Sequence, residues 1–315
     1  MRKIGTTALD VFELCLGGNV FGWTADERQS FAVLDAYAQA GGNFVDTADA
    51  YSAWAPGNSG GESETVIGRW MAARGNRDAI ILGTKVGMAP ELKGLSEKTI
   101  FAAVEGSLWR LQTDYIDLYY AHVDDPDTPL EETLGAFDSL VGEGKIRYAA
   151  ASNYSASRLA EALAVSKREG LTRYVALQTG YNLMDRAGYE GELEAVCARE
   201  GLSCLPYFAL AKGFLTGKYR PGADDVDSVR AESARAYLDE RGRRVLNMLD
   251  DLAAAHGVPV AAVALAWLLA KPTVASPVAS ARTPEQLADQ LPAATLVLAP
   301  DEVAALDAAS DPGAS

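Results

Sequence analysis

The chain has 315 residues, 49% of them apolar, and a formal net charge of -15, so it can bury a sizeable core and lacks the basic field that nucleic acid or an anionic membrane surface would require. No stretch approaches the roughly 20 apolar residues of a membrane span, and the N-terminus lacks the apolar segment of a signal peptide. The three cysteines, Cys15, Cys197 and Cys204, form no CxxC pair, so we expect a reducing cytoplasm and neither disulfides nor a structural zinc site.

Short apolar or β-branched runs recur along the whole chain. The segment before the first run, residues 1–11, could form a β-hairpin that closes the bottom of a barrel. Eight runs predict strands, and the segments between them carry apolar residues at helical spacing, with Ser or Asp near their starts and often Gly near their ends. The predicted strands fall within residues 12–18, 43–48, 79–87, 116–123, 145–153, 174–182, 202–210 and 273–280.

This alternation indicates right-handed βαβ units and a parallel sheet, and eight units in one domain over residues 1–315 favour a closed (β/α)8 TIM barrel, with an open doubly wound sheet as the alternative. No GxGxxG follows the first strand, since "GGNVFG" at residues 17–22 has the wrong spacing. Residues 210–244 are long for a βα loop and predict a mobile flap at the C-terminal face.

Ionisable side chains stand at the predicted C-terminal ends of neighbouring strands, where a barrel of this kind builds its active face. Asp46 ends one strand and Tyr51 follows it, Lys85 ends the next and His122 the one after. Each could be structural alone: a turn residue, a pocket wall, a solvated lysine, a core histidine. Their convergence favours a site, whereas His256, between a predicted helix and a glycine, is expected to be structural.

The four residues make chemical sense as one device. An ammonium at Lys85 favours the phenolate of Tyr51, so it is expected to lower a tyrosine pKa that is ordinarily about 10. Asp46 is placed to pair with Lys85 and keep it charged, and His122 can hydrogen-bond and orient a substrate oxygen.

Seven motifs, spread in order over almost the whole chain, resemble those of the aldo-keto reductase family. They are "DTADAYS", "GTKVG", "YYAHVDD", "ASNYS", "LQTGYNL", "LLAKP" and "ARTPEQL". The resemblance implies a (β/α)8 barrel that binds NADP(H) without a Rossmann fold and reduces a small-molecule carbonyl substrate by hydride transfer. It places the catalytic tetrad on Asp46, Tyr51, Lys85 and His122, with Tyr51 as proton donor, and leaves Asp49 a structural loop residue.

The same resemblance implies a set of cofactor contacts. Ser152, Asn153 and Gln178 would bind the nicotinamide carboxamide, and Tyr207 would stack on its ring. Phe208 and Ala209 depart from the serine and proline that the family more often has after that tyrosine, which puts the pyrophosphate contacts near this turn in question. The matching loop continues through Leu210, Lys212, Gly213 and Leu215.

The adenosine end of the cofactor is assigned to the last predicted strand and its loop. Arg282 would grip the 2'-phosphate, which favours NADP(H) over NAD(H), and Gln286 and Gln290 would lie near the adenine. Ser280 stands where many relatives have glycine. Thr283 and Pro284 are expected to open a helix whose N-terminal amides also favour an anion.

The substrate pocket is predicted from aromatic residues on loops. Phe21, Trp23 and Trp54 could wall a carbonyl pocket or could equally anchor their loops. The glycines within residues 52–64 suggest a lip that adjusts to substrate size.

Three other functions stay open at the level of sequence. The chain could be a redox-responsive regulatory subunit similar to the β-subunits of potassium channels. It could be a Schiff-base aldolase with Lys85 as nucleophile, although Asp46 would keep that amine charged. It could also be a nucleotide-sugar ketoreductase in which Lys218 and Arg220 meet the substrate's phosphates, unless both are solvated loop charges.

Overall fold

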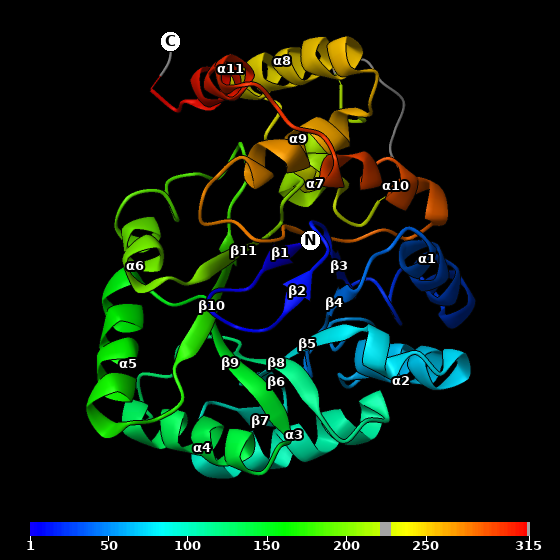
Figure 1. Ribbon diagram of the computed structural model, residues 1–315. Helices are drawn as coiled ribbons and strands as arrows, with labels where there is room; N and C mark the ends of the chain where they lie inside the picture. The colour runs from blue at the N-terminus through cyan, green and yellow to red at the C-terminus, as the bar shows by residue number, and fades with distance from the viewer. Residues whose placement is uncertain (221–227, 314–315) are drawn as a thin grey trace.

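The computed structural model describes residues 1–220 and 228–313, and within them eight parallel strands form one sheet in the order β11-β10-β9-β8-β5-β4-β3-β12. Helices surround the strands on the outside (Figure 1). Every one of the eight predicted strands is present, and the (β/α)8 barrel is confirmed. The strands are β3 (Cys15–Gly17), β4 (Phe44–Asp46), β5 (Ile81–Val86), β8 (Ile116–Ala121), β9 (Ile146–Ser152), β10 (Tyr174–Gly180), β11 (Ser203–Tyr207) and β12 (Val278–Ala279).

The ring closes between the strand at each end of that order. The Cys204 amide of β11 donates to the Thr273 carbonyl at 2.8 Å, and the Ala275 amide donates to the Cys204 carbonyl at 3.0 Å, so the residues just before β12 complete the ladder. The predicted N-terminal hairpin is also confirmed, as β1 (Arg2–Lys3) pairs antiparallel with β2 (Asp10–Val11).

The hairpin lies across the middle of the ring of strands (Figure 1). Its apolar residues Ile4, Leu9 and Val11 are buried against Leu118 and Leu205, which are among the side chains that fill the barrel interior. A hairpin that caps one mouth of the barrel leaves the other mouth, at the C-terminal strand ends, available for a site.

Eleven α-helices and three short 3-10 helices complete the described part of the chain. The α-helices are α1 (Glu27–Gln39), α2 (Glu62–Arg74), α3 (Glu97–Leu111), α4 (Leu130–Gly142), α5 (Ala156–Glu169), α6 (Glu192–Glu200), α7 (Ala231–Arg235), α8 (Glu240–His256), α9 (Val260–Leu269), α10 (Pro284–Ala288) and α11 (Pro300–Ser310). The 3-10 helices are η1 (Arg77–Ala79), η2 (Ala211–Thr216) and η3 (Leu291–Ala294), and a small hairpin joins β6 (Met88–Ala89) to β7 (Leu92–Lys93).

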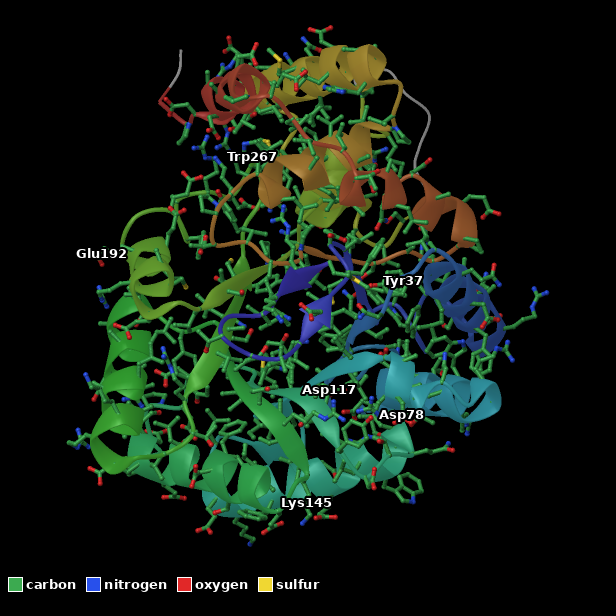
Figure 2. The ribbon with its side chains drawn as sticks, in the orientation of Figure 1. Tyr37, Asp78, Asp117, Lys145, Glu192 and Trp267 are labelled. Atoms are coloured by element: carbon green, nitrogen blue, oxygen red, sulfur yellow. The ribbon has the colours of Figure 1, made fainter. Side chains whose placement is uncertain are left out.

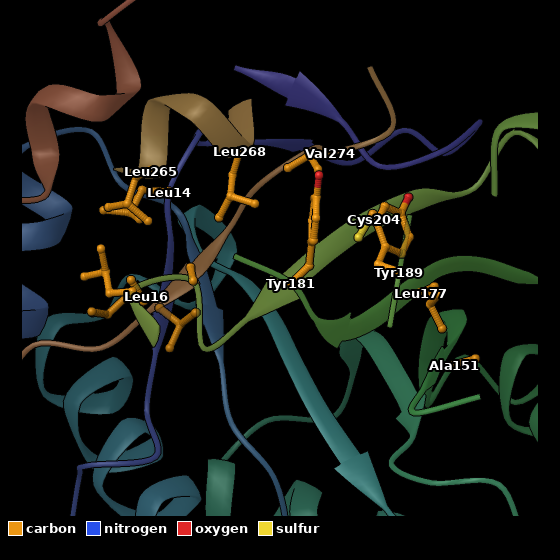
Figure 3. Packing of buried hydrophobic residues seen from close by; sticks show 14 of the residues in the cluster. Leu14, Leu16, Ala151, Leu177, Tyr181, Tyr189, Cys204, Leu265, Leu268 and Val274 are labelled. Atoms are coloured by element: carbon orange, nitrogen blue, oxygen red, sulfur yellow. The ribbon is translucent and has the colours of Figure 1, made fainter. Parts of the chain in front are cut away.

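The core lies between the strands and these helices. Helix α9 is the most apolar helix, and Ala261–Leu269 are all buried because the helix packs against α8, η2 and η3. Its Leu265 lies beside Leu14 in Figure 3, and its Trp267, labelled in Figure 2, donates its ring N–H to Asp307 of α11 at 2.9 Å. His256 ends α8 and contacts Glu302 at 2.7 Å, in line with its expected structural role.

Two further predictions from the sequence concern a flap at the C-terminal face and membrane-spanning helices. The flap predicted at residues 210–244 is not simply a loop, because it contains η2, α7 and the start of α8, and residues 221–227 lie outside the described residues. No single helix of the described chain is both long and apolar enough to cross a membrane, although α8 and α9, bent by 96°, pass that test as a pair on length and composition alone.

Gly68 allows α2 to approach α3 closely, and this contact can be tested. A Cβ at Gly68 would lie 2.3 Å from the Arg110 carbonyl oxygen. We expect Gly68→Ala to lower the free energy of unfolding by about 1–3 kcal/mol through overpacking, measured by denaturant unfolding. Gly135→Ala in α4 is the matched control, since its Cβ would meet nothing within 4 Å, and it should be neutral or slightly stabilising. Equal behaviour of the two variants would contradict this packing.

Candidate active site

A cavity of about 740 Å³ opens at the C-terminal ends of the strands, opposite the hairpin. Asp46, His122, Ser152 and Tyr207 reach it from the ends of four strands or from the residue just after, and η2, α10 and the residues just before α7 supply other parts of its wall. It is therefore the place where the sequence predicted an active face.

Lys85 lies beneath the cavity and joins other residues of the site by hydrogen bonds. Its ammonium is fully buried and donates hydrogen bonds to Asp46 Oδ2 at 2.6 Å, to the Thr47 carbonyl at 2.7 Å and to Tyr51 Oη at 2.9 Å. Tyr51 Oη also lies 3.5 Å from Asp46 Oδ2. The aromatic rings of Tyr51 and His122 meet edge to face at 6.0 Å. The structure thus brings together all four residues of the expected tetrad.

The turn between Asp46 and Tyr51 is held by neighbours on both sides. Thr47 donates its hydroxyl to Ser63 of α2 at 2.8 Å, and Ser52 donates to the Phe21 carbonyl at 2.9 Å. Ser52 has a φ of 71°, a conformation that costs a non-glycine residue about 1 kcal/mol. The sharp reversal after β4 therefore presents Tyr51 to the cavity with its backbone constrained.

The expected lowering of the Tyr51 pKa is wrong in direction. Burial raises the pKa of Tyr51 to about 12, and this outweighs the opposing effect of the Lys85 charge. For Lys85 the balance is the reverse: burial would lower its pKa, but Asp46 and Tyr51 raise it above the ordinary lysine value. At neutral pH the site therefore holds a charged Lys85 and a protonated Tyr51.

His122 is a neutral imidazole in this site. Burial lowers the pKa of His122 to about 3, and the nearby Lys85 charge acts in the same direction. Its Nδ1 has no hydrogen-bond partner in the described structure. A neutral ring beside Tyr51 can exchange a hydrogen bond with a bound oxygen atom.

The residues expected at the nicotinamide form a connected group at the cavity floor. Gln178 donates its side-chain amide to Asp46 Oδ1 at 2.8 Å, a link to the tetrad that the sequence did not suggest. Asn153, with φ at 58°, donates its amide to the His122 carbonyl at 2.9 Å and accepts from Tyr207 Oη at 2.8 Å. Ser152, Asn153, Gln178 and Tyr207 all border the cavity.

The residues expected at the adenosine end line the far part of the same cavity, with one exception. Ser280, whose hydroxyl contacts Asn19, lines it together with Arg282, Gln286 and Gln290. From the matching loop Leu210, Lys212 and Gly213 reach the cavity, whereas Leu215 does not, because it is fully buried in the core. The helix expected after Thr283 is present as α10, with Thr283 accepting from the Gln286 amide at 3.4 Å.

The aromatic wall expected for the substrate is only partly present. Trp23 and Trp54 border the cavity and meet edge to face at 5.5 Å. Phe21 was expected beside them, but it is fully buried in the hydrophobic core and does not reach the cavity. It lies four residues after the end of β3, and its side chain packs in the core, while its backbone carbonyl accepts a hydrogen bond from Ser52.

The lining residues that were not singled out from the sequence include Asn19, Met88, Arg230 and Asp289. Asn19 follows the C-terminal end of β3, and Asp289 lies between two glutamines already assigned to this end, so strand-end position and spacing could have indicated both. Arg230 lies 5.9 Å from the Trp23 ring and 5.7 Å from the Phe208 ring. Its place over the cavity depends on the path of a long segment, which no local pattern reports.

Positive charge gathers in the cavity of an acidic protein. Lys218, Arg230 and Arg282 all line it, and no carboxylate within residues 1–220 or 228–313 forms an ion pair with any of them. Burial, together with the charge of Arg282, lowers the pKa of Lys218, and the pKa of Arg230 is lowered by the same two effects. The charge of Arg282 thus disfavours the charged forms of Lys218 and Arg230, and a bound polyanion would offset this repulsion.

The fold and this site define a member of the aldo/keto reductase family. The family model described as "Aldo/keto reductase family" matches residues 13–311, and the chain belongs to that family.

Similar proteins are found in bacteria, fungi and plants. The chain is 37% identical over 306 residues to an uncharacterized oxidoreductase, YrpG, of Bacillus subtilis (strain 168), covering 94% of this chain and 91% of that protein. It is 33% identical over 334 residues to norsolorinic acid reductase B of Aspergillus parasiticus, covering 99% and 85% of the two chains. It is also 33% identical over 320 residues to a probable voltage-gated potassium channel subunit beta of Oryza sativa subsp. japonica, covering 98% and 95%.

Proposed function

We propose that the protein reduces an aldehyde or ketone to an alcohol with NADP(H), using Tyr51 as the proton donor. The observation that carries this proposal is the buried arrangement in which Lys85 contacts both Asp46 and Tyr51 beside a large cavity with a cationic wall. The oxidoreductase names of the bacterial and fungal relatives are in accord with it.

The residues around the cavity fit a dinucleotide cofactor. Two buried polar atoms that lack partners in the described structure, His122 Nδ1 and Gln290 Oε1, belong to residues at the two ends of the cavity. Ser152, Asn153 and Gln178 would hold the carboxamide, Tyr207 would pack on the ring, and Lys218, Arg230 and Arg282 would neutralise the phosphates. When bound, the reduced nicotinamide supplies a hydride to the carbonyl carbon.

The chain's own residues supply the proton and the geometry. Tyr51 is protonated at neutral pH because its pKa is about 12. Its phenolate is a weaker base than an alkoxide, so Tyr51 can still give its proton to the oxygen of the reduced substrate. As negative charge develops on the carbonyl oxygen, Tyr51 Oη donates its proton, and the Lys85 ammonium at 2.9 Å stabilises the phenolate that forms. Asp46 and Gln178 hold Lys85 and the cavity floor in place, and neutral His122 orients the oxygen.

The role of Arg282 can be tested by cofactor binding. Because a guanidinium forks onto a phosphate, we expect Arg282→Gln to weaken NADPH binding by about 1.5–3 kcal/mol, roughly 10- to 150-fold, and to leave NADH binding nearly unchanged. Fluorescence titration of wild type and variant with each nucleotide gives both affinities. An equal loss for NADPH and NADH would point to damage of the cavity rather than loss of a phosphate contact.

The geometry of the site disfavours an aldolase and supports a nucleotide-sugar ketoreductase only in part. An aldolase based on Lys85 is disfavoured, since its ammonium is fully buried, raised in pKa and bound to three acceptors. For a nucleotide sugar, Lys218 lines the cavity, but Arg220 is paired with Asp250 at 2.7 Å and does not border it.

A regulatory role is the second candidate, favoured by the likeness to the rice channel subunit. This role would be supported over reduction if the purified protein bound NADPH tightly but no carbonyl compound caused its oxidation.

A further inference from the structure

Asp49 has a buried side chain with no partner. It lies between Asp46 and Tyr51, is 4% exposed, and neither of its carboxyl oxygens has a hydrogen-bond partner in the described part of the chain. An ionised carboxylate in such a position is strongly unfavourable, so a buried carboxyl of this kind retains its proton. The mechanism proposed above assigns Asp49 no contact with cofactor or substrate.

The charged groups that face Asp49 are already used by other partners. They are Glu64 of α2, Arg110 of α3 and Lys85 of β5. Arg110 Nε donates to Glu64 Oε2 at 2.7 Å, and the Lys85 ammonium donates to Asp46 at 2.6 Å. The buried cluster therefore holds one guanidinium for two carboxyl groups, Glu64 and Asp49.

Glu64 is the member of this cluster whose carboxyl group has hydrogen-bond donors. Besides Arg110, it accepts the Thr84 hydroxyl at 2.6 Å, and its side chain is fully buried. Asp49 has no comparable donor, although the nearby Tyr119 hydroxyl, which also lacks a partner in the described structure, adds a titratable group on β8. Burial and then the charge of Glu64 raise the pKa of Asp49 to about 8, although Arg110, the adjacent Ala50 backbone amide and Lys85 act against this.

The cluster is tied to the active site through the backbone. The Asp49 amide donates to the Lys85 carbonyl at 3.3 Å, and Thr84, which binds Glu64, is the residue before Lys85. We propose that Asp49 positions the turn carrying Tyr51 as an uncharged carboxylic acid, and that its ionisation in alkaline solution displaces this turn and lowers turnover reversibly. The effect on turnover rests on the carbonyl reduction proposed above, whereas the effect on stability does not.

The sign of the stability effect follows from the proton that the folded state retains. An unfolded aspartate ionises near its ordinary pKa of 3.8, and the folded one near 8. Between these values the folded state binds a proton that the unfolded state does not, so this group makes stability fall as pH rises through that window. Above about pH 8 the loss is complete.

The test compares wild type with Asp49→Asn, a neutral variant of the same shape, and with Asp35→Asn as a matched control. Asp35 is hydrogen-bonded to Arg74, which lowers its pKa, so it is ionised throughout neutral and alkaline solution. Melting temperature by circular dichroism and turnover of 4-nitrobenzaldehyde at saturating NADPH are measured from pH 6 to 9.5.

We expect the wild-type melting temperature to fall between pH 6 and 8. In Asp49→Asn the decrease over the same pH range should be smaller, because the variant has no carboxyl group to ionise at this position. Wild-type turnover should decline above pH 8, by up to about tenfold per pH unit, with recovery on return to pH 7, and Asp49→Asn should not show this limb. Asp35→Asn should show the same pH dependence of melting temperature and of turnover as wild type.

Several outcomes would overturn the inference. A wild-type melting temperature that does not fall over this range would do so even if the variant failed to fold. Parallel pH profiles for wild type and Asp49→Asn would also do so. A difference in melting temperature with identical turnover profiles would remove the positioning role. If no protein reduces an aldehyde at pH 7, the proposed reduction fails, while the melting profiles still decide whether Asp49 retains its proton.

Discussion

Replacing Tyr51 by Phe is expected to lower kcat for aldehyde reduction by about 10²- to 10⁴-fold, the range found for a positioned general acid. The phenol is used only as charge develops on the carbonyl oxygen, so its loss should appear in kcat and kcat/KM together. Steady-state rates with NADPH and 4-nitrobenzaldehyde give both constants.

The same variant should keep its fold and its cofactor. Lys85 retains Asp46 and the Thr47 carbonyl as hydrogen-bond partners after the Tyr51 hydroxyl is removed. NADPH affinity by fluorescence titration and the melting temperature should therefore stay close to wild type. A Tyr51→Phe protein that keeps most of its kcat would show that the proton comes from elsewhere.

Replacing Lys85 by Met should affect stability as well as catalysis. It leaves Asp46 buried without its cation, and breaking a buried ion pair in this way costs about 3–5 kcal/mol. The free energy of unfolding at pH 7 from denaturant titration measures this loss. Turnover should also fall by orders of magnitude, because nothing then stabilises the Tyr51 phenolate.

A double variant separates the two effects. Asp46→Asn combined with Lys85→Met removes both buried charges, so most of the lost stability should return, while turnover should stay low. A single Lys85→Met variant with wild-type stability would contradict the ion pair. A double variant as active as wild type would contradict the role of Lys85 in proton transfer.

The barrel could be predicted because its signals are local and repeated. Each strand run and each amphipathic helix is legible in a short window, and parallel strands put Asp46, Lys85 and His122 at the same end of the sheet. The convergence of the four ionisable side chains could be anticipated from this topology.

Other features depend on burial and on long-range packing, which no short window reports. The direction of the Tyr51 pKa shift was mistaken, since desolvation outweighs the attraction of Lys85. Phe21 was placed on a loop at the pocket but turns into the core, and Arg230 reaches the cavity from a segment distant in sequence. The isolation of Asp49 also arises only once α2 and α3 pack against β5 and commit Arg110 to Glu64.

The most direct test of the proposed reduction is a fluorescence titration of the purified protein with NADPH and NADH, followed by addition of 4-nitrobenzaldehyde while nicotinamide absorbance is recorded. We expect tighter binding of NADPH than of NADH and oxidation of NADPH that depends on the aldehyde. Absence of NADPH binding would contradict the assignment of the cationic cavity to this cofactor. Tight binding with no oxidation by any carbonyl compound would contradict the reductase and favour the regulatory role.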